Sequence, residues 1–250
     1  TRLLVGADGA RSRVRQLAGI GERVRDYRQH ALVATVRCEQ PHGRAARQCF
    51  LPTGPLAFLP LDEPHTCAVV WSTVPEEAAR LEDLEPGPFA TELAAAFGRR
   101  LGAVELAGRR GRFPLVRGHA REYVRPRLAL VGDAAHHIHP LAGQGANLGL
   151  MDVATLAHCL REARERGRED PGRLPTLRRY ARWRRGENLK MIAAMDLFRE
   201  LFGTSSPAVA ALRGLGMKVA GTLPPVKEAI MLHAMGMEGD LPGEVRPARA

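Results

Sequence analysis

The chain has 250 residues, a formal net charge of +10 at pH 7 and 45% hydrophobic residues. This length and composition are those of a globular protein with a sizeable core, and they exclude a disordered chain. The positive charge is almost entirely arginine, since lysine occurs only at Lys190, Lys218 and Lys227. Because the arginines are scattered and form no basic stripe interleaved with aromatic residues, we expect no nucleic-acid partner.

The first third of the chain predicts a strand, a helical turn and then a series of short strands. Leu3–Val5 is an apolar run that ends in Gly6-Ala7-Asp8-Gly9, a pattern typical of a buried strand followed by a tight turn. Residues 12–17 predict a helical turn. Four further runs are separated by turns that contain proline and glycine or aspartate, and they predict an antiparallel sheet: residues 31–38, 48–51, 57–61 and 67–72.

The rest of the chain predicts two more strands and several helices. Residues 76–98 predict helix with a break at Pro86-Gly87-Pro88, and residues 112–116 and 128–131 predict strands. Residues 147–166 form the clearest amphipathic helix, with Gly167 as its expected stop and apolar residues at Val153, Leu156, Ala157 and Leu160. A long helix is expected over residues 176–202, with Thr176 as its N-cap, and two shorter helices over 209–220 and 226–237.

The cysteine and histidine patterns argue against a metal site. Cys38, Cys49, Cys67 and Cys159 form no CxxC pair, so we expect buried free thiols in a reducing compartment. His136, His137 and His139 do not share one helical face, and no cysteine or glutamate completes a ligand set, so we expect ordinary loop histidines. No apolar run reaches the length that spans a membrane.

Two segments share one pattern, an apolar strand followed by a glycine turn that carries an aspartate. They are residues 3–9, with Asp8, and residues 128–135, with Asp133. Ligands of open α/β sheets bind beyond the carboxyl ends of the strands, where a carboxylate can accept hydrogen bonds from ribose or ribityl hydroxyls. For either segment alone, the alternative is an Asx turn that only shapes the loop.

A glycine-rich stretch links the second segment to the helix that follows it. Gly143 and Gly145 allow a close approach of backbone to a ligand, and the helix start offers free N–H groups and a positive dipole end. Residues 143–149 exceed the GxGxxG spacing by one residue and lack a directly preceding strand, so the stretch is weak evidence by itself. Together with the Gly132-Asp133 turn it predicts a ligand-binding loop.

Two polar residues interrupt the apolar stripe of the long 176–202 helix. The stripe runs from Leu177 and Tyr180 to Met191, Met195, Phe198 and Phe202, and Arg184 and Asn188 lie on it at helical spacing. Buried polar groups need partners. Arg184 and Asn188 therefore either bind loop carbonyls and helix ends within the protein or contact a cofactor or substrate.

These motifs resemble those of the class A FAD-dependent aromatic monooxygenases, which have the para-hydroxybenzoate hydroxylase fold. Residues 6–15 are similar to the family's "DG" motif. Its "GD" motif is resembled by residues 132–136 together with Pro140, Gly143-Gln144-Gly145 and Asn147. A closer similarity, to the ubiquinone-biosynthesis hydroxylases, is carried by residues 51–61, 139–149, 184–188, 193–196 and 239–242.

The resemblance implies an α/β fold with three parts. The first is a Rossmann-like FAD-binding domain of the glutathione-reductase type with a parallel sheet, expected over residues 1–24 and 117–172. The second is an antiparallel-sheet substrate domain over residues 25–116, and the third is a helical C-terminal region over residues 173–250. The family's N-terminal βαβ unit with its GxGxxG fingerprint is not among these residues. We therefore expect an N-terminally truncated chain that is inactive by itself.

The resemblance also implies a reaction and a set of cofactor-binding residues. FAD is the expected cofactor, NAD(P)H the electron donor and O2 the oxidant, and the expected reaction hydroxylates the ring of a (poly)prenylated phenol in ubiquinone biosynthesis through a flavin hydroperoxide. Asp133 is expected to hold the ribityl chain, and Asp8 and Arg15 to organise the pyrophosphate and nicotinamide side. No catalytic residue is assigned. The expected cofactor-binding residues are Asp8, Gly9, Arg15, Gly132, Asp133, Pro140, Gly143, Gln144, Gly145, Ala146 and Asn147.

The resemblance implies a cytoplasmic protein, with the inner membrane surface and other ubiquinone-biosynthesis proteins as open partners. The expected membrane contact is made by the two C-terminal helices, 209–220 and 226–237. The first places Met217 beside Lys218, and the second places Met231, Leu232 and Met235 near Lys227. The alternative is that these helices pack on the flavin domain or on a partner subunit. Two other functions stay open: hydroxylation of a soluble aromatic or antibiotic substrate, and a non-catalytic scaffold role in a biosynthetic complex.

Overall fold

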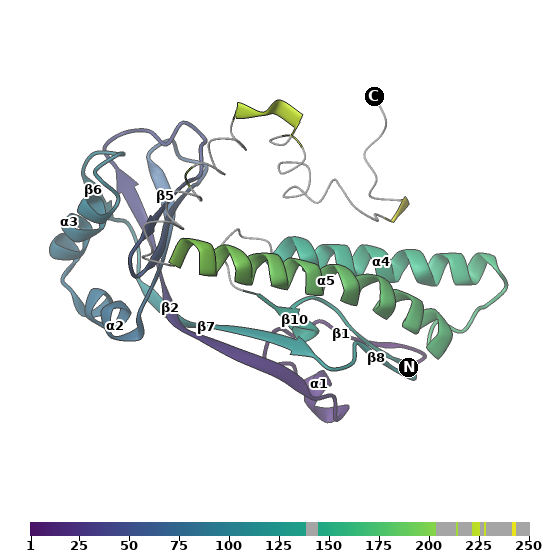
Figure 1. The fold of residues 1–250 in the computed structure, drawn as a ribbon. Coiled ribbons are helices and arrows are strands. Elements are labelled where there is room, and N and C mark those ends of the chain that lie inside the picture. Colours follow the sequence, from purple (N-terminus) through teal and green to yellow (C-terminus); the bar gives the residue numbers. More distant parts are fainter. Residues whose placement is uncertain (139–144, 204–213, 215–221, 226–227, 229–241, 244–250) are drawn as a thin grey trace. The chain divides into compact units, whose positions relative to one another are not determined.

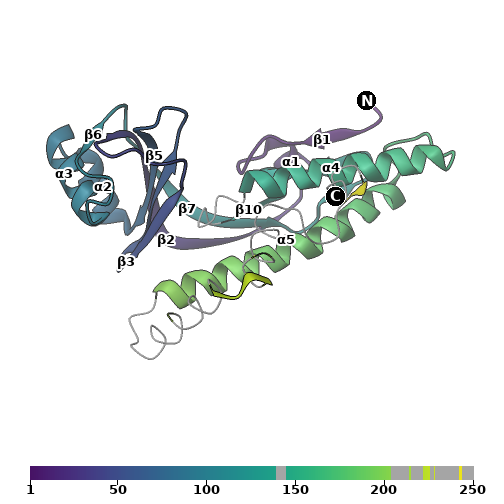
Figure 2. The same cartoon turned by 90° about the horizontal axis from the view of Figure 1, so that it is seen from above.

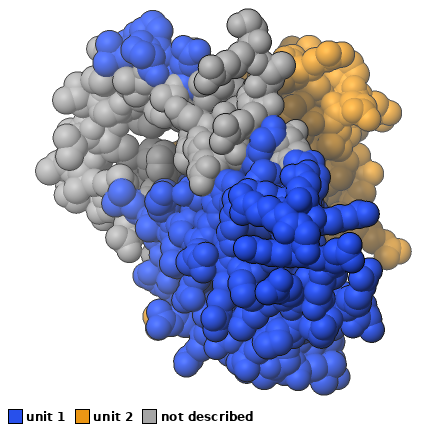
Figure 3. Space-filling view, turned by 90° about the vertical axis from the view of Figure 1, so that its right-hand side faces the viewer, with its two compact units in different colours: residues 1–25, 116–250 blue, residues 26–115 orange. Residues whose placement is uncertain are grey.

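The computed structural model describes residues 1–138, 145–203, 214, 222–225, 228 and 242–243 (Figure 1). The chain divides into two compact units, one made of residues 1–25 and 116–250 and the other of residues 26–115 (Figure 3). The helices predicted over 209–220 and 226–237, and with them the proposed membrane contact, lie outside the described residues except for isolated positions.

The first unit contains a three-stranded mixed sheet in the order β1-β9-β8. Strand β1 (Leu4–Gly6) is parallel to β9 (Leu128–Leu130), with Leu4 opposite Leu128 and Gly6 opposite Leu130. Strand β8 (Val124–Arg125) is antiparallel to the other side of β9. The two strands that precede the aspartate turns are thus neighbours and end at the same edge, although they are far apart in the sequence. The predicted α/β fold with parallel and antiparallel sheets is confirmed.

Two long helices, α4 (Gly145–Glu165) and α5 (Leu174–Gly203), lie side by side in this unit (Figures 1 and 2). An ion pair between Glu162 and Arg179 joins them. The unit also holds the short helix α1 (Arg13–Leu17), the 3-10 turn η1 (Gly132–Ala134) and strand β10 (His136–His137), which pairs with β7 (Gly111–Ala120). Its core consists of Ile20, Ala120, Tyr123, Ala129, Leu130, Val131, Ala135, Leu156, Cys159, Leu177 and Tyr180.

Two predicted features of these helices are wrong. Helix α5 begins at Leu174, so Thr176 lies inside the first turn and is not the N-cap. In α4, Leu156 and Leu160 of the predicted stripe pack on the core, but Val153 and Ala157 are exposed, because the buried face is rotated from that stripe. That face contains two polar residues, which hydrophobic periodicity does not detect. It consists of Leu148, Asp152, Thr155, Leu156, Cys159 and Ala163.

The second unit is built on an antiparallel sheet in the order β2-β5-β4-β3. Its strands are β2 (Glu22–Cys38), which starts in the first unit, β3 (Arg47–Leu51), β4 (Gly54–Pro60) and β5 (Thr66–Thr73), and β6 (Val104–Leu106) pairs with β2. The predicted antiparallel sheet is confirmed. Its core consists of Leu32, Ala34, Val36, Cys38, Leu56, Phe58, Cys67, Val69, Trp71, Leu81, Phe89, Leu93, Ala94, Phe97, Leu101 and Val104.

Helices α2 (Pro75–Asp83) and α3 (Pro86–Ala96) replace the single interrupted helix that the sequence predicts. Pro86 is the first residue of α3, where its missing N–H costs nothing. Arg110 donates hydrogen bonds to the carbonyls of Leu81 and Leu84 and so satisfies the C-terminal end of α2. Pro86 therefore marks the start of α3, and Arg110 binds the carbonyls that are left unpaired where α2 ends.

All four cysteines are free thiols, as predicted, and Cys38, Cys67 and Cys159 are buried. Burial raises the pKa of Cys38 to about 12, so this thiol stays protonated at neutral pH.

Candidate functional site

The first aspartate turn begins where β1 ends. A side chain at Gly6 would meet Leu130 Cδ2 at 2.8 Å and Val14 Cγ1 at 2.9 Å, so only glycine fits between β1, β9 and α1. The exposed Asp8 carboxylate accepts hydrogen bonds from Ser12 Oγ at 2.5 Å and Arg13 N at 2.7 Å. The bond from Ser12 is the main reason that the pKa of Asp8 is lowered. Asp8 therefore stabilises the first turn of α1, and its role toward a cofactor stays a prediction.

Replacing Asp8 by alanine separates these two roles. Loss of the contacts with the α1 amides is expected to lower the free energy of unfolding by about 0.5–2 kcal/mol, the usual cost of losing a helix cap. Chemical denaturation measures this change, with Asp62→Ala as the control because Asp62 is an exposed aspartate of the other unit. Equal stability of the two variants, combined with weaker FAD binding in Asp8→Ala, would contradict the capping role and favour direct cofactor contact.

Arg15 connects the two predicted motifs through the protein interior. Its side chain is only 5% exposed, and it donates hydrogen bonds to Ala10 O at 2.7 Å and to Ala134 O at 2.8 Å. It also forms an ion pair with Glu22 at 2.8 Å. Arg15 thus fixes the loop after β1 to the turn after β9, and its role toward a cofactor stays a prediction.

The second aspartate turn follows β9. Gly132 has φ +59°, a backbone conformation that favours glycine, and its Cα lies 3.2 Å from where a Cβ on Gly149 of α4 would be. Asp133, the next residue, is exposed, and its carboxylate forms no hydrogen bond or ion pair with the described residues, although its charge acts on His137. The exposed Asp133 therefore stands at the carboxyl edge of β1 and β9, the edge at which α/β sheets bind ligands.

The remaining predicted residues belong to the glycine-rich loop and the start of α4. Gly145, Ala146 and Asn147 form the first turn of α4, where Gly145 is half-buried and the other two are exposed. Pro140, Gly143 and Gln144 lie outside the described residues, as does His139. His136 and His137 lie in β10, and within the described part of the chain no group of three or more His, Cys, Asp or Glu residues is placed to hold a metal ion.

A buried polar network, which sequence reasoning only partly anticipated, lies behind the second turn. Asp152 of α4 is 0% exposed. Its Oδ2 accepts hydrogen bonds from Gly132 N at 3.0 Å and from His136 Nε2 at 2.6 Å. Its Oδ1 accepts from Arg184 Nε at 2.8 Å and from Asn188 Nδ2 at 3.2 Å. Arg184 and Asn188 therefore bind a group within the protein, as one of the two predicted alternatives has it. That group is the Asp152 carboxylate and not a loop carbonyl.

The charges around Asp152 explain its protonation state. Burial alone would raise its pKa, but the hydrogen bond and charge of His136, and then those of Arg184, hold the pKa below its usual value. Asp152 is therefore ionised at neutral pH.

The network continues from Asn188 to a buried histidine. Asn188 Nδ2 donates to the Tyr123 hydroxyl at 3.2 Å, and that hydroxyl lies 3.1 Å from His119 Nε2. Tyr123 therefore links Asn188 to His119 through its hydroxyl. Burial, followed by the charge of Arg185, lowers the pKa of His119 from 6.5 to about 4.

The His119 environment predicts an acid-sensitive fold. The unfolded chain binds a proton at His119 near pH 6.5, whereas the folded protein binds it only near pH 4. The free energy of unfolding is therefore expected to decrease as the pH is lowered from 6.5 to 4, by at most about 1.4 kcal/mol per pH unit. This group contributes no pH dependence above pH 6.5. Denaturation of the wild type and of His119→Gln, which keeps an acceptor for Tyr123, isolates the effect. Identical pH slopes for the two proteins would contradict it.

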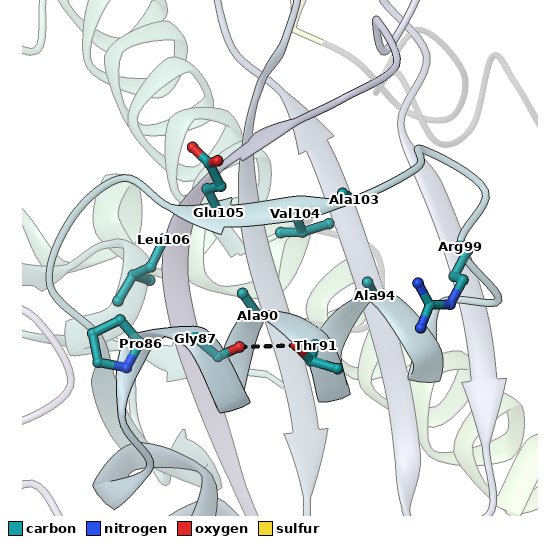
Figure 4. A pocket seen from close by; sticks show the side chains of 10 residues that line it. All are labelled: Pro86, Gly87, Ala90, Thr91, Ala94, Arg99, Ala103, Val104, Glu105 and Leu106. Atoms are coloured by element: carbon teal, nitrogen blue, oxygen red, sulfur yellow. Dashed lines mark hydrogen bonds between the residues drawn. The ribbon is translucent and has the colours of Figure 1, made fainter.

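A cavity of about 430 Å³ in the second unit lies between α3 and β6 (Figure 4). Its α3 side is lined by small residues, among them Gly87, Ala90 and Ala94, and Thr91 Oγ1 donates to Gly87 O at 3.1 Å. Its two charged residues, Arg99 and Glu105, lie apart, and Glu105 points away from α3 (Figure 4). The cavity therefore brings together no catalytic group, and the candidate site stays at the β1–β9 edge.

Comparison with known proteins identifies the class to which this fold and site belong. The sequence profile of the FAD binding domain family matches residues 1–188, three quarters of the chain. The chain belongs to the FAD binding domain family.

Several of the curated relatives are ubiquinone hydroxylases or ubiquinone biosynthesis monooxygenases. The chain is 43% identical over 237 residues to 3-demethoxyubiquinol 3-hydroxylase of Escherichia coli, with 94% of this chain and 60% of the relative covered. It is 44% identical over 235 residues to ubiquinone hydroxylase UbiL of Rhodospirillum rubrum, with 94% of this chain and 54% of the relative covered. The chain thus spans little more than half the length of these relatives. The predicted resemblance to ubiquinone-biosynthesis hydroxylases is confirmed.

The solved structures that the chain resembles have the same fold. For p-nitrophenol 4-monooxygenase PnpA of Pseudomonas putida, the TM-score is 0.75 at 23% identity, with 95% of this chain and 60% of that chain covered. For the Diels-Alderase PyrE3 of pyrroindomycin biosynthesis, it is 0.69 at 29% identity, with 96% and 51% covered. Among the helices that the structure describes, none is long and apolar enough to cross a membrane.

Proposed function

We propose that the natural protein containing this chain is an FAD-dependent monooxygenase that hydroxylates the aromatic ring of a prenylated phenol in ubiquinone biosynthesis. The observation that carries the proposal is the identity of 43–44% to two ubiquinone hydroxylases across 94% of the chain. At such identity the chemistry of a site is usually shared, whereas fold alone would not fix it.

The residues at the edge of β1 and β9 fit the flavin part of FAD. Asp133 offers an exposed carboxylate that accepts no hydrogen bond in the described part of the chain, which suits a ligand chain that carries hydroxyl groups. Gly132 and Gly149 bring the turn and α4 into backbone contact, so the first turn of α4 starts close to the same place. The positive dipole end of α4 at that turn can stabilise negative charge on a bound ring. Asp133 would therefore hold the ribityl chain, and Gly145, Ala146 and Asn147 would face the ring.

The proposed reaction needs an electron donor and a substrate besides FAD. When bound, FAD supplies the redox chemistry, so that one oxygen atom of O2 enters the ring and the other leaves as water at the expense of one NAD(P)H. The chain's own task is to hold the phenol, to exclude water and to orient the cofactor. We assign phenol binding to the sheet of residues 26–115, since β3 and β4 form the strand pair that resembles the substrate domain of the family.

The proposal places the protein in the cytoplasm, with a peripheral contact with the inner membrane. A prenylated phenol partitions into lipid, so an enzyme that modifies its ring benefits from working at the membrane surface. Other proteins of ubiquinone biosynthesis are the proposed partners.

A second candidate function is suggested by the fold neighbours. PyrE3 is named a Diels-Alderase of pyrroindomycin biosynthesis, so this fold serves more than one kind of chemistry. The alternative is hydroxylation of a soluble aromatic or antibiotic substrate. A purely structural role is distinguished from both by the absence of bound flavin.

Product analysis tests the proposal. The natural full-length protein is incubated with FAD, O2 and either NADH or NADPH, and with matched prenylated and unprenylated phenols. The proposal expects a product that has gained one oxygen atom from O2, formed faster from the prenylated phenol. A product from the unprenylated phenol only would favour the alternative, and flavin binding without any hydroxylation would overturn both enzyme functions.

A further inference from the structure

Both oxygens of the Asp152 carboxylate accept hydrogen bonds from groups of the protein. A carboxylate has about four lone-pair sites, and Asp152 fills them with four donors from strand β10, helix α5 and the turn after β9. Three of these donors are side chains, those of His136, Arg184 and Asn188. The fourth is the backbone amide of Gly132, which immediately precedes the proposed flavin ligand Asp133. No acceptor site is left for a ligand, so Asp152 can act on one only through its neighbours.

We infer that Asp152 is a positioning residue for the flavin, because its carboxylate holds the Gly132 amide and thereby fixes the direction in which Asp133 projects. This inference rests on the proposed function of Asp133. Gly132 has φ +59°, and a turn of this kind needs a fixed partner for its amide if the next side chain is to keep one direction. Asp152 supplies that partner from α4, whose first turn lines the same site.

The other partners of Asp152 keep its hydrogen bond with the Gly132 amide in place. His136 shares Oδ2 with Gly132, while Arg184 and Asn188 share Oδ1 and tie the carboxylate to α5. Arg184 also donates to Asn188 Oδ1 at 3.0 Å, so the two α5 side chains support each other. A carboxylate that is bound on both oxygens cannot rotate away from Gly132. The turn after β9, helix α4 and helix α5 therefore form one hydrogen-bonded assembly, which a hydrophobic core of the same volume would not provide.

The test separates positioning from ordinary stability. Asp152→Asn replaces one acceptor oxygen by a donor and so breaks at least one side of the assembly. The matched control is Thr155→Val, at another fully buried residue one turn further along α4, whose hydroxyl donates to Met151 O within the helix and not to the turn. Both variants of the natural full-length protein are compared at equal free energy of unfolding, adjusted with denaturant or stabilising salt. The two measurements are hydrogen exchange of the Gly132 amide without FAD, and the dissociation constant for FAD.

The expected result for Asp152→Asn is Gly132 exchange at least tenfold faster than in the wild type and FAD binding at least tenfold weaker, with changes below threefold for Thr155→Val. Equal changes in the two variants, or an unchanged Gly132 amide in Asp152→Asn, would overturn the inference. If Asp152→Asn does not fold, the wild type decides: the Gly132 amide is expected to be as protected as that of Leu130 in β9, and rapid exchange would overturn the inference. If the wild type does not bind FAD, the proposed function fails, while Gly132 exchange still reports whether Asp152 holds the turn.

Discussion

Replacing Asp133 by alanine is expected to weaken FAD binding about tenfold to a hundredfold. The substitution removes a charged acceptor from the edge of β1 and β9, and a hydrogen bond to a charged group contributes about 1.5–3 kcal/mol. Asp133 is exposed and forms no hydrogen bond or ion pair with the described residues, so the unfolding midpoint is expected to stay within experimental error of the wild type. Fluorescence titration with FAD measures the affinity, and thermal denaturation measures the stability.

Two further variants make the Asp133 result specific. Asp133→Asn keeps an acceptor without the charge, and it is expected to bind FAD with an affinity between those of the wild type and Asp133→Ala. Asp62→Ala removes an exposed carboxylate from the other unit and is expected to change nothing. Equal FAD affinity of wild type and Asp133→Ala would contradict the account and would reduce Asp133 to a residue that shapes the turn.

The largest expected loss of stability follows from replacing Arg184 by methionine. Arg184 is 4% exposed and is one of two cationic or protonatable partners of the fully buried Asp152, the other being His136. Removing one partner of a buried ion pair typically costs about 3–5 kcal/mol, because the remaining charge is left without compensation. Methionine fills a similar volume, so the loss reports the charge and the hydrogen bonds and not a cavity. Chemical denaturation of Arg184→Met against the wild type measures it.

Arg182→Met is the matched control, since Arg182 is exposed on the same helix. Its loss of stability is expected to be below about 0.5 kcal/mol, as for most surface substitutions. The double variant Arg184→Met with Asp152→Leu removes both charges and is expected to recover part of the loss. A cost below about 1 kcal/mol for Arg184→Met would show that the Asp152 carboxylate is not held as an ion pair.

The sequence predicts the strands and turns of this fold well where the local signal is strong. The apolar run before Gly6 and the run before Gly132 are both strands, and their shared strand-turn-aspartate pattern corresponds to a shared position, since β1 and β9 are parallel neighbours. Strands β6, β8 and β10 were not predicted, because these segments of two or three residues are neither apolar runs, as β1 and β9 are, nor long enough to show alternation. Their pairing is determined by neighbouring strands in the folded protein.

The candidate site is less predictable because its key contacts are long-range. The burial of Arg184 and Asn188 could be predicted from their place on the apolar stripe, but their partner could not, since Asp152 lies on another helix. Asp152 itself was missed because the apolar residues of α4 indicated another face. The local signal for Asp152 is its helical spacing from Leu148 and Thr155. A buried aspartate at this spacing cannot be distinguished in the sequence from an exposed aspartate.

A crystal structure of the natural full-length protein with FAD tests most directly whether the flavin binds at the turn after β9. We expect the ribityl hydroxyls within hydrogen-bonding distance of the Asp133 carboxylate, the isoalloxazine ring facing the first turn of α4, and the Gly132 amide still bound to Asp152. A flavin bound elsewhere, with Asp133 facing solvent, would contradict the claim.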